Sequence, residues 1–298
     1  MISVLIAAYN AEKYISRCLD SLVGQTFKKF EVIIVNDCSL DATATIVEQY
    51  VKASSLNIRL INLPVNSGVS AVRNRCLKEA KGTAFYFVDA DDWLEKECLQ
   101  KLHDRMFEEH CDMVVCNFML DCEKQSDAFF VHDCDLSTAR LSFIAGQWAV
   151  VWRCLIKRDL VRKLNLSFES DIKAGEDYLF LVKLILNVET YSKIEEPLYH
   201  YVVCNTISLM RGANLQATFD QFRATEMVEK YIEANFNSPY YRKALNYRRL
   251  YLKKEIFKQA LNVWKKWRPE ANKFKSSKFL SLKDKIIYRL ISLLSNFL

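Results

Sequence analysis

The stretch Phe85-Tyr86-Phe87-Val88-Asp89-Ala90-Asp91-Asp92-Trp93 joins an apolar run to a group of carboxylates. The apolar part predicts a buried strand that ends where the carboxylates begin. Because residues i and i+2 of an extended chain point to the same side, we expect Asp89 and Asp91 to face one pocket. Two carboxylates placed together suit Mg²⁺ or Mn²⁺, which commonly take one or two protein carboxylates plus substrate phosphates. The alternative is a solvated turn in which Asp92 caps the next helix.

Strand and helix patterns alternate on both sides of this stretch. The predicted strands span 2–8, 31–35, 58–63 and 84–88, and the predicted helices span 11–23, 41–52 and 70–80. This alternation is typical of an α/β domain with a mostly parallel sheet and helices on both faces. In such sheets the ligand binds at the carboxyl ends of the strands. Ala8-Tyr9-Asn10 follows the first strand and Asn36-Asp37-Cys38-Ser39 the second, so polar side chains gather at this edge.

Length and composition exclude several classes of protein. The chain has 298 residues, of which 51% are hydrophobic and only 6 are glycine, so it can bury a core and is not intrinsically disordered. No apolar run approaches the ~20 residues that span a bilayer, and the run at 2–9 is too short for a signal peptide. Neither G-x-G-x-x-G nor G-x-x-x-x-G-K-[ST] is present, which disfavours a dinucleotide-binding domain and a P-loop. A divalent metal is therefore the expected phosphate ligand.

The ten cysteines are scattered along the chain without any C-x-x-C pair. A zinc site needs ligand pairs at short spacing, and a disulfide framework is typical of small secreted chains. We therefore expect reduced thiols that serve as small hydrophobic side chains in a cytoplasmic protein.

Four motifs, in this order along the chain, resemble those of family-2 glycosyltransferases, which are inverting enzymes with the GT-A fold. They are SVLIAAYN at 3–10, VNDCSLD at 35–41, NSGVSAVRN at 66–74 and FVDADDW at 87–93. The sequence departs from the family at Ala7, where Pro is common, and at Asn36 and Cys38, where Asp and Gly are frequent. Asp37 itself is kept. The resemblance extends over residues 1–215.

This resemblance implies roles for individual residues. Those implied to bind a nucleotide-sugar donor are Ala8, Tyr9, Asn10, Asp37, Asn66, Arg73, Asp89 and Ala90. Among them, Tyr9 would lie beside the nucleoside, Asp37 would accept a hydrogen bond from the base, and Asp89 would contact the ribose or the metal. Asp91 is implied to be the direct metal ligand and Arg73 a cation near the nucleotide. For Arg73, an exposed position on a helix surface is the alternative.

The second half of the chain supplies the implied catalytic base. Gly175-Glu176-Asp177-Tyr178 precedes an apolar helix and resembles the family's G-E-D segment, in which the aspartate is the general base toward the acceptor hydroxyl. A base beside a metal site is what a single displacement requires. The alternative for Glu176 and Asp177 is an acidic helix start, which the helix dipole favours.

Three further side chains are candidates for this site. Trp148 and Trp152, with Glu176, resemble the acceptor side, where aromatic rings stack on sugars; tryptophan is equally common in protein cores. His200 is a candidate ligand of the metal or the diphosphate, with a structural histidine as the alternative.

Charge is distributed unevenly along the chain. Residues 241–298 hold 16 Lys and Arg against 3 Asp and Glu, whereas residues 1–240 hold 26 against 33. Over 282–298, apolar residues recur at helical spacing beside Lys283, Lys285 and Arg289, which is typical of a helix on an anionic membrane surface. A helix that packs on the catalytic domain, or on a second subunit of a homo-oligomer, has the same periodicity. Nucleic-acid binding is not expected, because the sequence contains no recognition module.

We therefore predict a GT-A-like catalytic domain over 1–215 and a basic helical region over 216–298. The hypothesis is metal-assisted transfer of a sugar, from a UDP-linked donor to a free or lipid-linked saccharide hydroxyl, in cell-surface polysaccharide, lipopolysaccharide or capsule synthesis. The enzyme would be cytoplasmic and peripheral on the inner face of the membrane. Two alternatives stay open. One is a transferase with a polyprenyl phosphate acceptor, which would need little help from a base such as Asp177. The other is a non-catalytic nucleotide- or saccharide-binding subunit of a membrane assembly.

Overall fold

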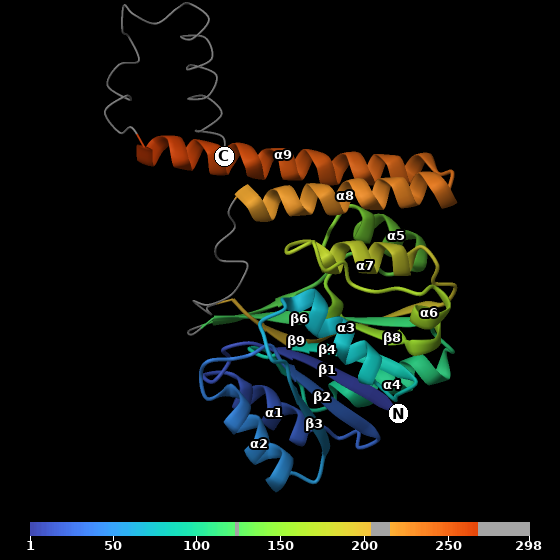
Figure 1. Cartoon of the computed structure of the whole chain (residues 1–298). Helices are drawn as coiled ribbons and strands as arrows, with labels where there is room; N and C mark the ends of the chain where they lie inside the picture. The colour runs from blue at the N-terminus through green and yellow to red at the C-terminus, as the bar shows by residue number, and fades with distance from the viewer. Residues whose placement is uncertain (123–124, 204–214, 268–298) are drawn as a thin grey trace, which may run out of the picture.

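The structure is a computed structural model that describes residues 1–122, 125–203 and 215–267 (Figure 1). The strands are β1 (Ile2–Ala8), β2 (Phe30–Asn36), β3 (Asn57–Asn62), β4 (Ala84–Asp89), β5 (Trp93–Leu94), β6 (Met113–Cys122), β7 (Gln125–Phe129), β8 (Cys154–Lys157) and β9 (Tyr191–Val202). The helices are α1 (Ile15–Val23), α2 (Thr43–Ala53), α3 (Val69–Glu79), α4 (Cys98–Glu108), α5 (Leu136–Ile144), α6 (Arg158–Lys163), α7 (Glu176–Ile185), α8 (Leu215–Asn235) and α9 (Pro239–Trp267). The stretch 282–298, with its predicted membrane-surface helix, lies outside the described residues.

One mixed sheet runs through the described part of the chain. Its strands follow the order β3-β2-β1-β4-β8-β6-β9-β5, with β7 paired to β6. The strands β1 to β4 are parallel, with Ala8 opposite Asn36 and Ala7 opposite Asp89. In the second half, β8 runs antiparallel to both β4 and β6, whereas β9 is parallel to β6. The predicted α/β fold is confirmed, and the parallel pairing holds for the strands that the sequence pattern located.

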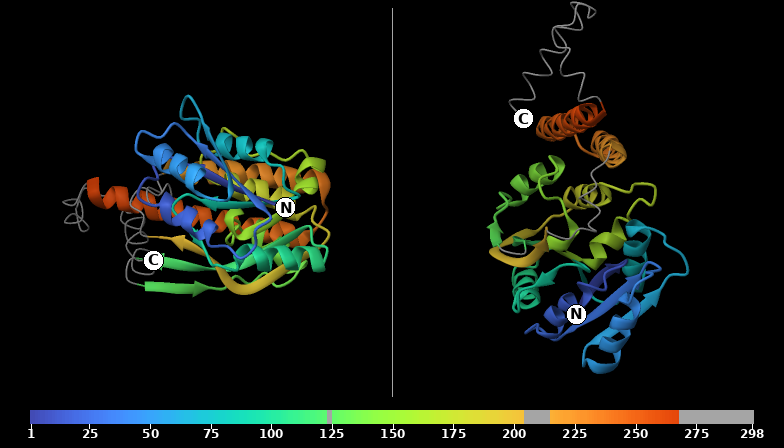
Figure 2. Two further views of the ribbon diagram at one scale, coloured as in Figure 1. Left: turned by 90° about the horizontal axis from the view of Figure 1, so that it is seen from below. Right: turned by 90° about the vertical axis from the view of Figure 1, so that its left-hand side faces the viewer.

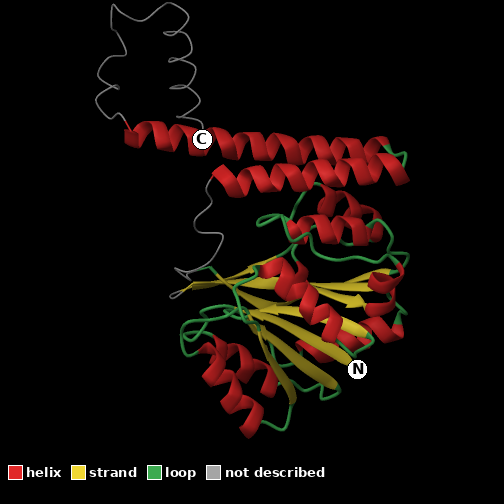
Figure 3. Ribbon diagram, viewed as in Figure 1, coloured by secondary structure: helices red, strands yellow, loops and turns green. Residues whose placement is uncertain are grey.

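Helices cover both faces of this sheet (Figure 3). Alternate side chains of a strand point to opposite faces, and on β1 Val4 and Ile6 pack with α1, α2 and α4 whereas Leu5 packs with the other layer. That second layer contains α3, α5, α6 and α7. The antiparallel pair α8 and α9 forms a further layer outside α5 and α7 (Figures 1 and 2). The helical C-terminal region is therefore confirmed as an addition to the α/β core.

Most of the described cysteines follow the sequence-based expectation. Six of their thiols are buried and free, whereas Cys38 is half-buried and Cys134 is exposed, and burial raises the pKa of Cys76 to about 12 and that of Cys116 to about 11. Cys122 is disulfide-bonded, so the expectation of reduced thiols throughout is wrong at this position. Cys122 is exposed at the end of β6, outside the apolar core, and so does not serve as a small buried hydrophobe.

No helix in the part of the chain that the structure describes has both the length and the apolar content to cross a membrane.

Candidate active site

The ends of β1, β2 and β4 lie side by side at one edge of the sheet. Ala8 accepts a hydrogen bond at 2.8 Å from the backbone N–H of Asp37, and Ala7 is the register partner of Asp89. Tyr9 is 47% exposed here, so its ring is accessible to a ligand. The sequence predicted that side chains after these strands would meet at one edge, and they do. The side chains of Ala8 and Ala90 are buried in the core, which leaves only backbone groups at these two positions for a donor.

The loops after β1 and β2 are joined by hydrogen bonds, and each loop contains a residue with a strained backbone conformation. Asn10 and Cys38 have φ of +49° and +58°, in the left-handed region that glycine adopts most easily. The Asn10 N–H donates to Ser39 Oγ at 3.0 Å, and Leu40 N–H donates to Asn10 Oδ1 at 2.9 Å. The geometry at Cys38 gives a physical reason why glycine is frequent at this position of the family, since a side chain there costs on the order of 1–3 kcal/mol.

Asp37 connects the end of β2 to the start of α3. Its carboxylate is buried, with one oxygen accepting from the Ser67 N–H at 2.7 Å and the other from the Gly68 N–H at 2.9 Å. The Asn66 side-chain amide donates to the Asp37 carbonyl at 3.2 Å. Each carboxylate oxygen can accept a second hydrogen bond, so the contact from Asp37 to a base stays a prediction. What the structure adds is that Asp37 fixes the helix that carries Arg73.

Arg73 is the centre of a buried ionic cluster. Its Nη1 donates to Asp177 Oδ1 at 2.5 Å and to Glu176 Oε1 at 2.9 Å, and its Nη2 lies 3.4 Å from Asp89 Oδ1. The guanidinium also lies 5.5 Å from the centre of the Phe168 ring. Arg73 is only 5% exposed, so the alternative of a helix-surface arginine does not hold. The cluster brings Asp89, implied for the donor, together with Asp177, implied as the base.

The charges of this cluster shift one another's pKa values. Burial alone would lower the pKa of Arg73, but the charges of Asp177, Asp89 and Glu176 outweigh it and raise that pKa, so the guanidinium stays a cation. Burial raises the pKa of Asp177 to about 7; Glu176 and Asp89 act in the same direction, and Arg73 opposes them. Asp177 therefore exchanges a proton near neutral pH, as a general base requires.

The backbone at the start of α7 positions Asp177. Gly175 precedes the helix with φ of +92°, and Glu176 and Asp177 occupy the first helical turn, as the acidic-start alternative also predicts. The second oxygen of Asp177 accepts from the Val151 N–H at 3.3 Å. A Cβ atom added at Gly175 would lie 3.3 Å from Gln221 Cα, so α8 packs directly against this turn.

Asp92 has a different role from its neighbours Asp89 and Asp91. Asp92 is buried and accepts from the Tyr199 hydroxyl at 2.7 Å and from the Val202 N–H at 2.8 Å, so it ties the turn to β9. The alternative in which it caps the next helix is wrong, because α4 begins only at Cys98. Burial and the charges of Asp91 and Asp89 raise the pKa of Asp92 well above its usual range.

Asp89 and Asp91 are the residues that could hold a divalent cation. Within the described residues, no group of three or more His, Cys, Asp or Glu side chains is arranged as a complete metal site. Mg²⁺ and Mn²⁺ do not need one when a substrate supplies phosphate oxygens. The side chain of Asp89 is 31% exposed, and the like charges gathered in this turn are what a cation would offset. These residues therefore fit such a metal.

His200 has protein partners for both of its ring nitrogens. Nδ1 lies 3.0 Å from Asp121 Oδ2 and Nε2 lies 2.9 Å from Glu95 Oε1. The ring stacks on Trp93 at 3.4 Å, and Trp93 Nε1 also donates to Asp121. This arrangement matches the structural alternative for His200, and its metal role stays a prediction.

Trp148 and Trp152 belong to an aromatic cluster beneath the second half of the sheet. Trp152 is buried and stacks on Tyr199 at 4.4 Å and on Tyr201 at 5.4 Å. Trp148 is half-buried and packs 4.6 Å from Phe118. The core alternative therefore describes Trp152, and only Trp148 keeps surface for an acceptor. Glu176, which was also predicted on the acceptor side, accepts a hydrogen bond from Arg73.

Two residues near the site were missed by sequence reasoning. Tyr199 accepts from the Asp89 N–H at 3.1 Å while donating to Asp92, and Arg17 donates to the Asp91 carbonyl at 3.0 Å. Tyr199 adjoins His200, which had been singled out, but nothing in the sequence distinguishes Arg17 from other helix-surface cations.

The fold is GT-A-like, and carboxylates gather at the ends of its parallel strands. Residues 3–142 match the model of glycosyl transferase family 2, so this segment of the chain belongs to that family. The sequence is 32% identical over 210 residues to EpsJ, an uncharacterized glycosyltransferase of Bacillus subtilis, with 67% of this chain and 60% of EpsJ covered. It is also 32% identical over 206 residues to the poly(ribitol-phosphate) β-N-acetylglucosaminyltransferase TarS of Staphylococcus aureus, with 67% of this chain and 35% of TarS covered. The chain thus spans less than two thirds of either relative.

Solved structures show the same fold. Residues 1–349 of Staphylococcus aureus TarS with UDP-GlcNAc superpose with a TM-score of 0.71 at 24% identity, covering 95% of this chain and 77% of that one. The mannosyltransferase PcManGT of Pyrobaculum calidifontis, with GDP-Man and Mn²⁺, gives a TM-score of 0.63 at 18% identity, covering 99% and 80%.

Proposed function

We propose that the chain transfers a sugar from a UDP-linked donor to a saccharide hydroxyl, with inversion at the anomeric carbon. The observation that carries this proposal is the buried link Asp177–Arg73–Asp89, which holds a titrating carboxylate beside the strand edge implied for the donor. The UDP-GlcNAc bound to TarS, a protein with the same fold, supports UDP as the nucleotide. The names of two relatives, a poly(ribitol-phosphate) β-N-acetylglucosaminyltransferase and a glycosyltransferase named for teichuronic acid biosynthesis, support our proposal of a role in cell-surface polysaccharide synthesis.

The reaction needs one proton acceptor and one displacement. As the acceptor oxygen bonds to C1 of the sugar, the bond from C1 to the diphosphate oxygen breaks and UDP leaves. Asp177 takes the proton of the attacking hydroxyl, and its pKa of about 7 suits that step. Arg73 and the Val151 N–H keep the carboxylate oriented through its two oxygens. Two lone-pair positions of the Asp177 carboxylate remain for the acceptor hydroxyl.

The donor would lie along the strand edge. Tyr9 offers an exposed ring for stacking on the base, and Asp37 holds the adjacent loop. Asp89 and Asp91 would hold Mn²⁺ or Mg²⁺, which when bound offsets the negative charge of the diphosphate leaving group. The Mn²⁺ in the PcManGT structure, which shares the fold, supports this part of the proposal.

The test is the release of UDP from UDP-GlcNAc or UDP-glucose with Mn²⁺ and a saccharide acceptor. We expect Asp177→Asn to lower turnover by about 10²- to 10⁴-fold, the usual contribution of a general base, while UDP affinity is kept. The matched control is Asp159→Asn, because Asp159 is an exposed carboxylate in the first turn of α6, away from the cluster. Normal turnover of Asp177→Asn with saccharide acceptors would contradict the base assignment.

Two other outcomes point to the alternatives. Turnover of Asp177→Asn with a polyprenyl phosphate acceptor would indicate an acceptor that is already anionic. UDP binding without UDP release, for every donor and acceptor tried, would indicate a non-catalytic subunit.

A further inference from the structure

One face of α9 is exposed over residues 243–254, and we call it the outer face. It consists of Lys243, Tyr247, Leu250, Lys253 and Lys254, which recur at the three- and four-residue spacing of a single helix face. Leu250 is 67% exposed and Tyr247 is 55% exposed. An apolar centre is thus flanked by cations.

The opposite face of α9 fixes this orientation. Leu245 and Leu252 are buried at 2% and 1% exposure, and Leu245 belongs to the second core layer. Arg248 lies between them in sequence and packs over the Tyr178 ring of α7 at 4.8 Å. Because α9 cannot rotate without losing these contacts, its outer face is held away from the catalytic domain.

The cations of the outer face lack carboxylate partners in the part of the chain that the structure describes. Lys243, Lys253 and Lys254 form no ion pair with the residues that the structure describes, and the outer face contains no carboxylate. By contrast, Arg249, on the side that faces α8, pairs with Glu229. The sequence from 268 to 298 adds 7 Lys and Arg against 2 Asp and Glu. The outer face therefore lies at the beginning of a region with excess positive charge.

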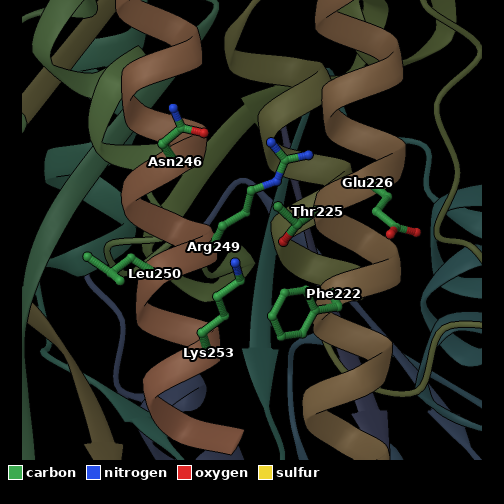
Figure 4. A pocket seen from close by; sticks show the side chains of 7 residues that line it. All are labelled: Phe222, Thr225, Glu226, Asn246, Arg249, Leu250 and Lys253. Atoms are coloured by element: carbon green, nitrogen blue, oxygen red, sulfur yellow. The ribbon is translucent and has the colours of Figure 1, made fainter.

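A groove between α8 and α9 borders the outer face. Its volume is about 580 Å³, and it is lined by Phe222, Thr225 and Glu226 of α8 and by Asn246, Arg249, Leu250 and Lys253 of α9 (Figure 4). Lys253 points from α9 into the gap, beside the Phe222 side chain. Two apolar side chains, two cations and one carboxylate thus line the groove, so the charge that favours an anionic lipid comes from the outer face.

We propose that the outer face of α9 binds an anionic lipid bilayer. Tyr247 and Leu250 enter the interface, and the lysines pair with lipid phosphates. A second copy of the chain fits this surface less well, because a twofold dimer through the outer face would place the lysines of one copy against the lysines of the other. This inference concerns location and does not depend on the proposed reaction.

The test is co-sedimentation of the full-length chain with vesicles of phosphatidylglycerol and phosphatidylcholine. Each lysine near such a surface contributes about fivefold to binding, so Lys243→Glu/Lys253→Glu/Lys254→Glu is expected to lower the partition coefficient by at least about 100-fold. The matched control is Lys29→Glu/Lys52→Glu/Lys163→Glu, which changes exposed lysines elsewhere by the same net charge. It should sediment with only a small loss, and pure phosphatidylcholine should bind neither protein.

Several outcomes would overturn the proposal. They are wild-type chain that stays in the supernatant with anionic vesicles, a face variant that sediments like wild type, and a control variant that loses as much as the face variant. If the Glu variant does not fold, the corresponding three Lys→Gln changes replace it. A wild-type dimer that becomes monomeric in the face variant, with vesicle binding unchanged, would assign the surface to a second copy.

Discussion

Replacing Arg73 with methionine should move the pH dependence of the reaction, since Arg73 is the cation that holds down the pKa of Asp177. The carboxylate lies 2.5 Å from the guanidinium, and its pKa is already raised to about 7 by burial. Losing an opposite charge at this distance raises a carboxylate pKa by a further ~1–3 units. The acidic limb of the rate profile should therefore move to about pH 8–10. At pH 7 the ionised fraction would fall from about half to about one tenth or less, so kcat/KM should drop at least about fivefold.

The assay is kcat/KM for UDP release measured from pH 5.5 to 10 with saturating acceptor. Arg75→Met is the control, because Arg75 lies on the same helix but is 43% exposed and, among the described residues, pairs only with Glu79. Its profile should match wild type. Breaking a buried ion pair costs about 3–5 kcal/mol of stability. Arg73→Lys therefore serves as a second variant: it keeps the positive charge, so its acidic limb should stay near pH 7. An Arg73→Met variant whose acidic limb stays near pH 7 would refute the electrostatic argument.

Three further predictions concern residues with structural or donor-side contacts. His200→Ala loses two carboxylate partners and a ring stack, so urea denaturation should show about 2–4 kcal/mol less stability with an unchanged Mn²⁺ requirement; a higher Mn²⁺ requirement at unchanged stability would restore the metal role. Trp152→Ala removes a buried ring and should cost about 3–5 kcal/mol, while the acceptor KM of the folded enzyme stays the same; a selective rise in that KM would favour the acceptor-side role. Asp37→Ala removes the acceptor of the Ser67 and Gly68 N–H groups and should cost about 1–2 kcal/mol and weaken UDP binding in calorimetry, whereas retained UDP affinity would remove Asp37 from the donor site.

The first half of the fold was predictable because its pattern is local. Each parallel strand is a short apolar run with a helical stretch after it, and the predicted strand 2–8 coincides with β1. The edge of the sheet then follows from topology alone, which is why Tyr9, Asp37 and Asp89 were expected together. The second half pairs strands that are distant in sequence, such as β4 with β8 and β6 with β9, and local patterns do not specify such pairings.

The ionic cluster needed the tertiary structure for the same reason. Arg73 and Asp177 are separated by 104 positions, and only the packing of α3 near α7 brings them together. Arginine is usually exposed, so its burial could not be inferred from its own motif. His200 shows the converse: its residue type suggested a ligand, but Glu95 and Asp121 occupy both ring nitrogens.

The close packing of Gly175 against α8 has a consequence for how the chain can be divided. Its Cα faces Gln221 and Ala224 so tightly that a methyl group would crowd them, and the next two residues are Glu176 and Asp177. The C-terminal helices therefore support the turn that carries Asp177, the proposed base. A fragment that ends before α8 would expose the surface on which α8 packs. We therefore expect the residues before α8 to be a poor module for a chimeric protein unless α8 and α9 are kept with them.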